Sequence, residues 1–515
     1  MPGASSPFFT STDYVMILPI TMLTFFALGI LLFDLWVPEI KRLSAAVALG
    51  GLFFATVGIT GIPRFGFFRG IPGIYRHLEG LRLQGISGQP ALSGSMLIDA
   101  FTVYFWSLFI AAAAISILIS MRYLDEEKEH HGEYYALILF AVVGMMCMAA
   151  GVDIVLIFIG LELMAISTYV LVGFLRGNRR SNEAALKYLL LGAFSSGIFA
   201  YGLSLFYGLT GSTNLLVIRS TLDRQLEVTN GHPSPVVVLA LLTTAVGLLF
   251  KIAAVPFHQW APDAYEGAPT SITGFMSVAV KAAAWAMLLR VLIIGLGGLA
   301  NTWTPIIIFV AIITMTGANL AALTQTNLKR LLAYSSIAHV GYMLLGLVAM
   351  TSRQAFSDAF KGILLYLMVY TFMNLGAFAV VTALRHRNVI GDEIDDINGL
   401  YSRAPVEAVL MLLFLLSLAG IPPLAGFYGK YFIFLSLIES GHYILAALGV
   451  AYSVFGLYYY LKVANAVFMR EPLEKEPLSV SFGMRVALAI TACATLGIGI
   501  LPEQFIRVVT WSIGR

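Results

Sequence analysis

The chain has 515 residues, of which 59% are hydrophobic and only 11% charged, a composition that excludes an ordinary soluble protein. Its net charge is +3, and its Lys and Arg residues are scattered through short loops, which excludes nucleic-acid binding. The two cysteines, Cys147 and Cys493, lie in apolar segments. We therefore expect them to be small buried side chains, and we expect no disulfide framework, redox pair or metal centre.

Long, continuous apolar runs predict membrane-spanning α-helices rather than the alternating strands of an outer-membrane barrel. Runs of about 18 or more mostly apolar residues, separated by polar or Gly/Pro clusters, predict fourteen spans. The expected spans are 13–36, 43–63, 97–120, 134–151, 153–175, 183–209, 235–261, 270–296, 303–323, 331–351, 358–384, 404–437, 443–468 and 483–510. The sequence thus predicts an all-α, polytopic membrane protein.

The loops indicate how these spans are oriented. No basic residue precedes the first span, so we expect an uncleaved first helix rather than a signal peptide. The longest polar insert, Arg64–Ser95, is too rich in glycine for a helix and too short for a domain. Odd-numbered loops carry fourteen Lys and Arg residues and even-numbered loops carry seven. Because basic loops remain in the cytoplasm, we expect a multi-pass protein of the bacterial inner membrane with both termini in the periplasm.

Three short features recur in the same order in two parts of the chain, five spans apart. They are the segments 169–173 and 342–346, the segments 181–187 and 357–361, and the proline interruptions at Pro256 and at Pro422–Pro423. A shift of five spans reverses the direction of each helix. We therefore expect two inverted five-helix repeats, with helices 7 and 12 broken near the middle of the membrane.

Glu162 and Lys251 place opposite charges inside apolar spans. An isolated Lys or Glu at the bilayer centre costs about 2.5–3.5 kcal/mol on insertion scales, so both are functional candidates. Burial disfavours their charged forms and mutual proximity favours them, so a pair with adjustable separation can load and release a proton. The alternative is a static ion pair. The break at Pro256 is expected to free carbonyls near the Lys251 ammonium, and His258 beyond it is a candidate relay or a packing residue.

Further buried groups extend this row along the chain. Lys281 lies near the middle of the eighth span with no opposite charge three or four residues away, so its partner is on another helix or is water. Lys430 follows the second break in a glycine-rich stretch, where a wet cavity is expected. His339 in the tenth span is a candidate relay or a packing residue. Lys187 and Lys361 begin their helices, where snorkelling to the interface is the alternative.

The candidate cations in these spans are all lysines, which can lose their charge on burial, whereas arginine stays protonated. The loop 129–133 contains two histidines and two glutamates, but as a charged loop between spans it is expected to be solvated rather than to bind metal. The chain has no HExxH, no GxxxxGK[ST] and no dinucleotide fingerprint.

Two long motifs resemble the antiporter-like membrane subunits of respiratory complex I. They are the run Phe250–Pro269, followed by Lys281, and the run Leu418–Lys430. The resemblance covers nearly the whole chain from the third span onward. Among the paralogous types it is most similar to subunit N, called subunit 2 in mitochondria, because it stops after fourteen spans and has Lys at position 430. The N-terminal segment and the Arg64–Ser95 insert have no counterpart in this resemblance.

What the resemblance implies is a proton-translocating subunit of NADH-quinone oxidoreductase, hence part of a translocase. The implied roles are proton loading by Glu162 and Lys251, modulation by Lys187, connection through Lys281 and His339, and exit at Lys430. No redox cofactor is implied in this chain, since flavin, iron–sulfur clusters and quinone belong to partner subunits. The implied partners are paralogous antiporter-like subunits, small membrane subunits, lipid and protons.

We expect four parts: N-terminal helices in 1–130, a first half-channel in 131–298, a second, inverted half-channel in 299–470 and a last helix in 471–515. Two other functions remain open at this point. One is a subunit of a sodium/proton antiporter, and the other is a structural membrane scaffold.

Overall fold

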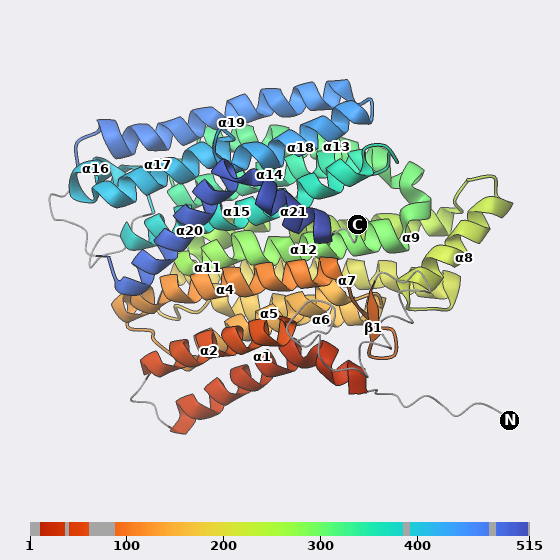
Figure 1. Cartoon of the computed structure of the whole chain (residues 1–515), viewed down its shortest axis with the longest axis horizontal. Coiled ribbons are helices and arrows are strands. Elements are labelled where there is room, and N and C mark those ends of the chain that lie inside the picture. The colour runs from red at the N-terminus through yellow and green to blue at the C-terminus, as the bar shows by residue number, and fades with distance from the viewer. Residues whose placement is uncertain (1–10, 37–40, 61–87, 385–391, 473–479, 513–515) are drawn as a thin grey trace.

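The structure, a computed structural model, describes residues 11–36, 41–60, 88–384, 392–472 and 480–512 and consists almost entirely of helices (Figure 1). Long helices run side by side along the longest axis of the molecule, as expected for membrane spans (Figure 1). This confirms the predicted all-α class. Both chain ends and residues 64–87 of the polar insert lie outside the described residues. The location of the termini therefore stays a prediction.

The N-terminal elements lie at one edge of the bundle and lead into its centre (Figure 1). They are α1 (Ser11–Trp36), α2 (Lys41–Thr60), an antiparallel hairpin of β1 (Gln89–Ala91) and β2 (Met96–Ile98), and α4 (Ala100–Glu127). Asp99 fixes the start of α4, because its carboxylate accepts a hydrogen bond from the Thr102 N–H at 2.8 Å.

The next group of helices contains the first break. It comprises α5 (Gly132–Ala150), α6 (Ile154–Val172), α7 (Arg179–Thr210), α8 (Leu215–Val228), α9 (Pro235–Ile252), α10 (Trp260–Gly267), α11 (Thr270–Phe275), a π-helix at Met276–Val280, α12 (Lys281–Leu289) and a second π-helix at Arg290–Gly295. The helix α8 was not expected from the sequence. It is short, forms part of the connection between α7 and α9, and protrudes at one end of the molecule (Figure 1).

The remaining helices contain the second break. They are a 3₁₀ turn at Gly297–Leu299, α13 (Ala300–Leu323), α14 (Leu328–Ala349), α15 (Phe356–Leu384), a 3₁₀ turn at Ile394–Ile397, α16 (Leu400–Arg403), α17 (Pro405–Ala419), α18 (Ala425–Glu439), α19 (Tyr443–Met469), α20 (Phe482–Ile500) and α21 (Pro502–Ser512). The helix α20 packs against both α4 and α15 and so joins the last group of helices to the N-terminal elements (Figure 1).

The two predicted helix breaks are present, and each begins at a residue in the left-handed region. The helix α9 ends at Ile252 because Ala253 has φ of 60° and its N–H bonds back to the last turn. The helix α17 ends at Ala419 because Gly420 has φ of 88°. The first break therefore begins three residues before Pro256, the residue from which it was predicted.

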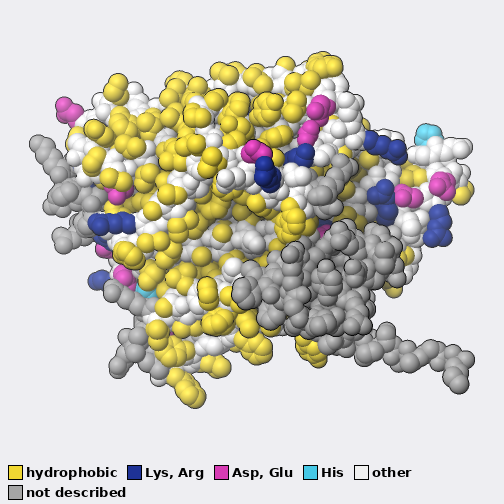
Figure 2. All heavy atoms as spheres, viewed as in Figure 1, with side chains coloured by type: hydrophobic (Ala, Val, Ile, Leu, Met, Phe, Trp, Pro, Cys, Tyr) yellow, Lys and Arg dark blue, Asp and Glu magenta, His cyan; other side chains and the backbone are white. Residues whose placement is uncertain are grey.

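Twelve helices in the described residues are long and apolar enough to cross a membrane. Two shorter apolar helices, Leu43–Ile59 and Pro405–Ala419, coincide with the other two predicted spans, so the count of fourteen remains a prediction. The inverted relation of the two repeats also remains a prediction. Figure 2 shows hydrophobic side chains over much of the visible face, with most charged side chains toward the two ends of the view. This distribution is typical of a bundle surrounded by lipid.

Burial places the centre of the bundle at α14 and α15. In each, 94% of the most apolar 18-residue stretch is buried, compared with 28% for α1 and 33% for α19 at the edges. One expectation was wrong: Cys493 is exposed on the surface of α20, and Cys147 is partly buried. An apolar surface facing lipid has the same sequence pattern as an apolar core, so burial at this position could not be read from the sequence.

Candidate functional site

Four of the predicted cationic and imidazole side chains lie inside the bundle. Lys251, Lys281, His339 and Lys430 are between 2% and 7% exposed, although each belongs to a different helix. Burying such groups is costly, and each therefore requires polar partners. Those partners differ from one position to the next.

Lys251 lies in the last turn of α9, with its ammonium 3.5 Å from the Tyr169 hydroxyl on α6. Glu162, two turns before Tyr169 on the same helix, interacts electrostatically with Lys251. No ion pair of 4 Å or shorter joins Glu162 to Lys251 in the described part of the chain, and the buried Oε1 of Glu162 has no hydrogen-bond partner there. The two charges are therefore neighbours that are not locked together.

No hydrogen bond joins the Lys251 ammonium to a backbone carbonyl of the first break in the described structure. The Phe250 carbonyl accepts hydrogen bonds from the Ala253 N–H and, at 3.0 Å, from the Trp260 indole N–H at the start of α10. His258 lies in the broken segment, and its Nδ1 is buried without a hydrogen-bond partner among the described residues. His258 thus has an unused polar atom, and no hydrogen bond joins it to Lys251 in the described part of the chain.

Lys281 lies where the first π-helix passes into α12. Its ammonium donates a hydrogen bond to the Ser336 hydroxyl on α14 and lies 5.8 Å from the centre of the Tyr265 ring. The expectation that the partner of Lys281 lies on another helix is confirmed. Ser336 precedes His339 by three residues, so the two side chains share one face of α14.

His339 is enclosed by tyrosines. Its Nδ1 bonds the Tyr366 hydroxyl on α15, and its Nε2 lies 3.0 Å from the Tyr460 hydroxyl on α19. The Tyr460 hydroxyl also bonds Ser335 on α14. His339 interacts electrostatically with both Lys281 and Lys430. Both ring nitrogens have hydroxyl partners, so this group can pass a proton as well as pack.

Lys430 is held by the second break itself. Its ammonium donates to the carbonyls of Ala419 at 2.8 Å and Leu418 at 3.3 Å, the last residues of α17, and lies 5.0 Å from the Tyr342 ring centre. These carbonyls have no helical donor because the helix ends there. A cavity of about 390 Å³ opens beside Lys430, lined mostly by apolar residues of α18 and α19.

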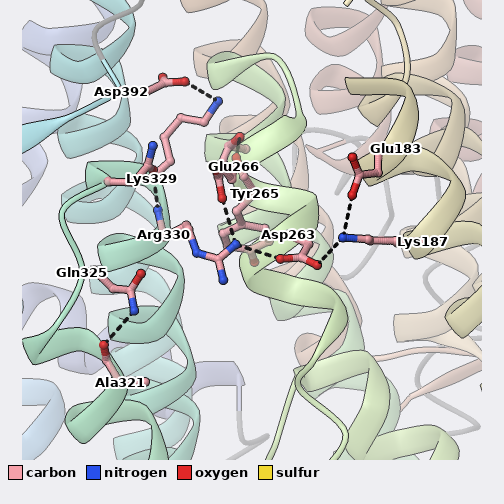
Figure 3. Close-up of polar contacts among 12 residues, drawn as sticks. Glu183, Lys187, Asp263, Tyr265, Glu266, Ala321, Gln325, Lys329, Arg330 and Asp392 are labelled. Atoms are coloured by element: carbon pink, nitrogen blue, oxygen red, sulfur yellow. Dashed lines mark hydrogen bonds and ion pairs between the residues drawn. The ribbon is translucent and has the colours of Figure 1, made fainter. Parts of the chain in front are cut away.

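Lys187 lies away from this buried row, in a chain of ion pairs (Figure 3). Its ammonium is 2.9 Å from Glu183 on α7 and 3.0 Å from Asp263 on α10. Arg330 at the start of α14 approaches Asp263 from the other side at 2.7 Å and also contacts Glu266 at 2.8 Å (Figure 3). Burial raises the pKa of Asp263, but the bonds and charges of Arg330 and Lys187 outweigh it and lower the pKa below its usual value.

Among the described residues no hydrogen bond or ion pair joins Lys187 to Glu162 or Lys251, and the Lys187 side chain is 46% exposed. Lys361, its counterpart in the second repeat, pairs with Asp358 on its own helix at 3.0 Å. Any effect of Lys187 on the Lys251 site must pass through α7 or α10.

Sequence reasoning missed the buried ion pair of Arg290 with Asp99. The Arg290 guanidinium forms two hydrogen bonds with the Asp99 carboxylate, at 2.6 and 2.8 Å, and a third with Thr102 at 2.9 Å. It also donates to the Ala149 carbonyl at 3.0 Å, so it is fully partnered at 3% exposure. A signal was available, because Arg290 is an arginine within the predicted eighth span.

Sequence reasoning also missed the hydroxyl groups that partner the buried cations. These are Tyr169, Ser336, Tyr366 and Tyr460. No signal distinguishes them in one sequence, because tyrosine and serine are common in apolar helices and their partners are far away along the chain. Within the described ranges, no three His, Cys, Asp or Glu side chains are grouped so as to hold a metal ion.

Comparison with known proteins gives consistent results. The family described as "NADH:quinone oxidoreductase/Mrp antiporter, TM" matches residues 151–456. The chain is 60% identical to NADH-quinone oxidoreductase subunit N 1 of Koribacter versatilis, over 98% of this chain and 96% of that protein. It is 50% identical to NADH-quinone oxidoreductase subunit N 2 of Solibacter usitatus, over 99% of each.

Solved structures agree. A chain of respiratory complex I from Thermus thermophilus is 30% identical, with a TM-score of 0.75 over 95% of this chain and 98% of that chain. A chain of the Mrp complex from Dietzia sp. is only 18% identical but has a TM-score of 0.80 over 98% of this chain and 97% of that chain. The second match shows a shared fold alone.

Proposed function

Because this chain belongs to the family of antiporter-like membrane subunits that includes subunit N of NADH-quinone oxidoreductase, we propose that it translocates protons within that complex. The observation that carries the proposal is the buried row of Lys251, Lys281, His339 and Lys430. None of the three lysines has a carboxylate within 4 Å among the described residues, so none is locked in a static ion pair. Such groups can change their protonation at modest cost.

In this proposal Glu162 and Lys251 load the proton. Their electrostatic interaction without a closed ion pair supports this role, because a separation that can change alters both charges. Lys281 passes the change in charge to His339 through Ser336, and the electrostatic interaction of His339 with both Lys281 and Lys430 supports its place in the row. Lys430, at the second break beside an open cavity, is the exit residue.

The charge of one group alters the protonation state that the next group favours. The row therefore works by shifts in the populations of protonation states rather than by one large movement. His258 is a secondary proton relay in this scheme. Its Nδ1 has no hydrogen-bond partner in the described structure with which to exchange a proton. Lys187 modulates the loading pair indirectly. We place electron transfer, with its flavin, iron–sulfur clusters and quinone, in the partner subunits.

The finer organisation is part of the same proposal. We propose N-terminal helices in 1–130, half-channels in 131–298 and 299–470 and a last helix in 471–515, with the two half-channels inverted. The excess of basic residues in odd-numbered loops supports cytoplasmic placement of those loops in a bacterial inner membrane, with the termini on the periplasmic side.

A sodium/proton antiporter subunit is the alternative, and the fold does not separate it from the first proposal. The sequence does, because identity reaches 60% with a subunit N and only 18% with the Mrp chain. We infer that the chain works in a redox-driven complex with paralogous and small membrane subunits.

The deciding experiment measures proton pumping and quinone reduction in membrane vesicles that contain the assembled complex. Lys251→Ala is expected to lower NADH-driven proton pumping per assembled complex at least tenfold. Asp358→Asn, which changes a partly exposed charge outside the row, is the matched control. Pumping by Lys251→Ala at the level of the control would overturn the assigned role. Sodium-driven proton exchange in vesicles without electron donors would favour the antiporter.

A further inference from the structure

A closed circuit of contacts runs through Lys251 and three aromatic side chains. The ammonium lies 3.5 Å from the Tyr169 hydroxyl, and the Tyr169 ring meets the Tyr188 ring edge-on at 4.6 Å and 88°. Tyr188 stacks on Trp260 at 4.5 Å and 11°, and the Trp260 indole N–H bonds the Phe250 carbonyl at 3.0 Å. Phe250 is the residue before Lys251, which closes the circuit. We name Tyr169, Tyr188 and Trp260 the aromatic collar.

The collar is well buried. Tyr169 is 6% exposed, Tyr188 1% and Trp260 2%. Paired aromatic rings fix each other in edge-to-face and stacked arrangements. Gly192 on α7 faces the Tyr169 hydroxyl so closely that a methyl group at this position would collide with it. The position of the hydroxyl is therefore set from three sides.

Two of the three helices that hold the collar, α7 and α10, also carry an ion pair at their surface. On α7, Lys187 directly precedes Tyr188, and on α10, Asp263 lies one turn after Trp260. Lys187 and Asp263 are 3.0 Å apart (Figure 3). The ion pair and the ring stack thus bridge α7 and α10 at two neighbouring points. A change at one bridge must alter the spacing at the other.

Asp263 also links this pair to a third helix. Arg330 of α14 contacts Asp263 at 2.7 Å from the side opposite to Lys187 (Figure 3). The helix α14 carries Ser336 and His339 of the buried row. The position of α10 is therefore set by cations from both repeats.

We propose that the aromatic collar positions the Lys251 ammonium, with Tyr169 as its hydrogen-bond partner, and that the ion pairs of Asp263 with Lys187 and Arg330 control the collar through α10. This inference rests on the proposed role of Lys251. It makes Tyr169, Tyr188 and Trp260 positioning residues. It also gives Lys187 a route to Lys251 that needs no contact between them.

The collar has a definite task in this scheme. With its rings stacked as in the structure, the collar keeps the ammonium beside the Tyr169 hydroxyl. Its three buried rings also fill the space between Lys251 and the partly exposed ion pairs. When Asp263 exchanges or loses a cation, α10 shifts and the ring stack loosens. Lys251 then loses its fixed partner and can approach Glu162, which interacts with it but forms no ion pair in the present arrangement.

The first test removes one hydroxyl. Tyr169→Phe keeps the ring and is expected to lower proton pumping per assembled complex about tenfold, since a hydrogen bond to a charged group is lost. Tyr104→Phe is the matched control, because Tyr104 is also 6% exposed and its hydroxyl makes one bond, to the Leu364 carbonyl at 2.6 Å. A loss less than threefold beyond that of Tyr104→Phe overturns the inference, and a larger loss supports it.

The second test asks whether the surface ion pairs and the collar act together. Asp263→Asn and Tyr169→Phe do not alter touching side chains, so independent effects would multiply in the double variant. Control through α10 predicts instead that the double variant loses no more pumping than the worse single variant. Asp358→Asn combined with Tyr169→Phe is the control pair and is expected to multiply. Multiplying losses in the Asp263 pair would overturn the route through α10.

Gly192→Ala tests the same inference if the Tyr169→Phe variant does not assemble into the complex. It keeps every hydroxyl but displaces the one on Tyr169, and is expected to lower pumping per assembled complex at least threefold. Gly197→Ala on the same helix, where a methyl group meets nothing within 4 Å, is its control. Equal pumping in the two glycine variants would overturn the inference. If Lys251→Ala retains pumping, the proposed function fails instead, whatever the collar variants do.

Discussion

The two helix breaks of this protein look alike in sequence but hold their lysines differently. At the first break the Lys251 ammonium contacts a tyrosine hydroxyl and lies near a carboxylate, while the adjacent Phe250 carbonyl is occupied by Trp260. At the second break the Lys430 ammonium is held by two backbone carbonyls and lies near no carboxylate in the described structure. The first lysine therefore lies near a carboxylate whose charge can change, whereas the second is held directly by fixed dipoles.

This difference suits a loading site and an exit site. A cation beside a carboxylate responds to the protonation of that carboxylate, whereas a cation on fixed carbonyls responds to more distant charges and to water. The ion pair of Arg290 with Asp99 is a reference for both lysine sites, because its two charges are in direct contact and hydrogen-bonded to each other. We predict the effects of substitutions at Asp99, at Glu162, at the two breaks and at Asp263, from the largest expected effect to the smallest.

Asp99→Ala is expected to have the largest effect on stability. It leaves the Arg290 guanidinium buried without its carboxylate, which costs about 3–5 kcal/mol. Thermal denaturation of the purified complex, followed through this subunit, measures the loss. We expect pumping per complex that still assembles to remain near normal, because this pair is structural. A large loss of pumping in stable complexes would place Arg290 in the proton pathway instead.

Glu162→Gln tests the carboxylate that only the first break possesses. We expect proton pumping per assembled complex to fall about tenfold or more, equivalent to about 1.4 kcal/mol or more in rate. Stability should change by less than about 1 kcal/mol, because the buried Oε1 makes no hydrogen bond to lose. The comparison of the breaks would be wrong if pumping stayed within twofold of the unmodified complex.

Gly420→Ala and Ala253→Gly exchange the residue types that begin the two breaks. The left-handed backbone at Gly420 disfavours a side chain by about 1–2 kcal/mol, and a methyl group there would also press on the Lys430 side chain. Ala253→Gly relieves the same strain but loses a buried methyl group, so its effect should stay within about 1 kcal/mol. Unfolding of the two variants side by side checks the asymmetry. Equal destabilisation would mean that the breaks are built alike.

Asp263→Asn should give the smallest effect and a dependence on pH. The pKa of Asp263 is lowered in the folded chain from its usual value of 3.8. Its ion pairs therefore stabilise the fold at any pH above the usual pKa, and this stabilisation is lost as the pH falls through the lower pKa of the folded chain. The stability difference between Asp263→Asn and the unmodified complex, below about 1 kcal/mol at neutral pH, should therefore shrink below about pH 4. A difference that is constant with pH would show that the carboxylate charge is not involved.

Much of this molecule follows from the sequence. Apolar runs require helices in lipid because every backbone group must be bonded within the segment, and this determined the all-α class and the approximate position of each span. Pro256 and Pro422 determined that two helices break, since proline removes a donor from the helix. The cost of burying charge singled out Glu162 and the three lysines.

Only the tertiary structure decided what each buried charge contacts. The partners of Lys281 and His339 lie on other helices, 27 to 121 residues away along the chain, and nothing in the local sequence of Ser336, Tyr366 or Tyr460 marks them as partners. The same holds for Lys187, whose pairing with Asp263 depends on how α7 packs against α10. A sequence shows where a charge must be compensated, because that cost is local. Which group compensates it depends on helix packing, which brings together residues far apart in the chain.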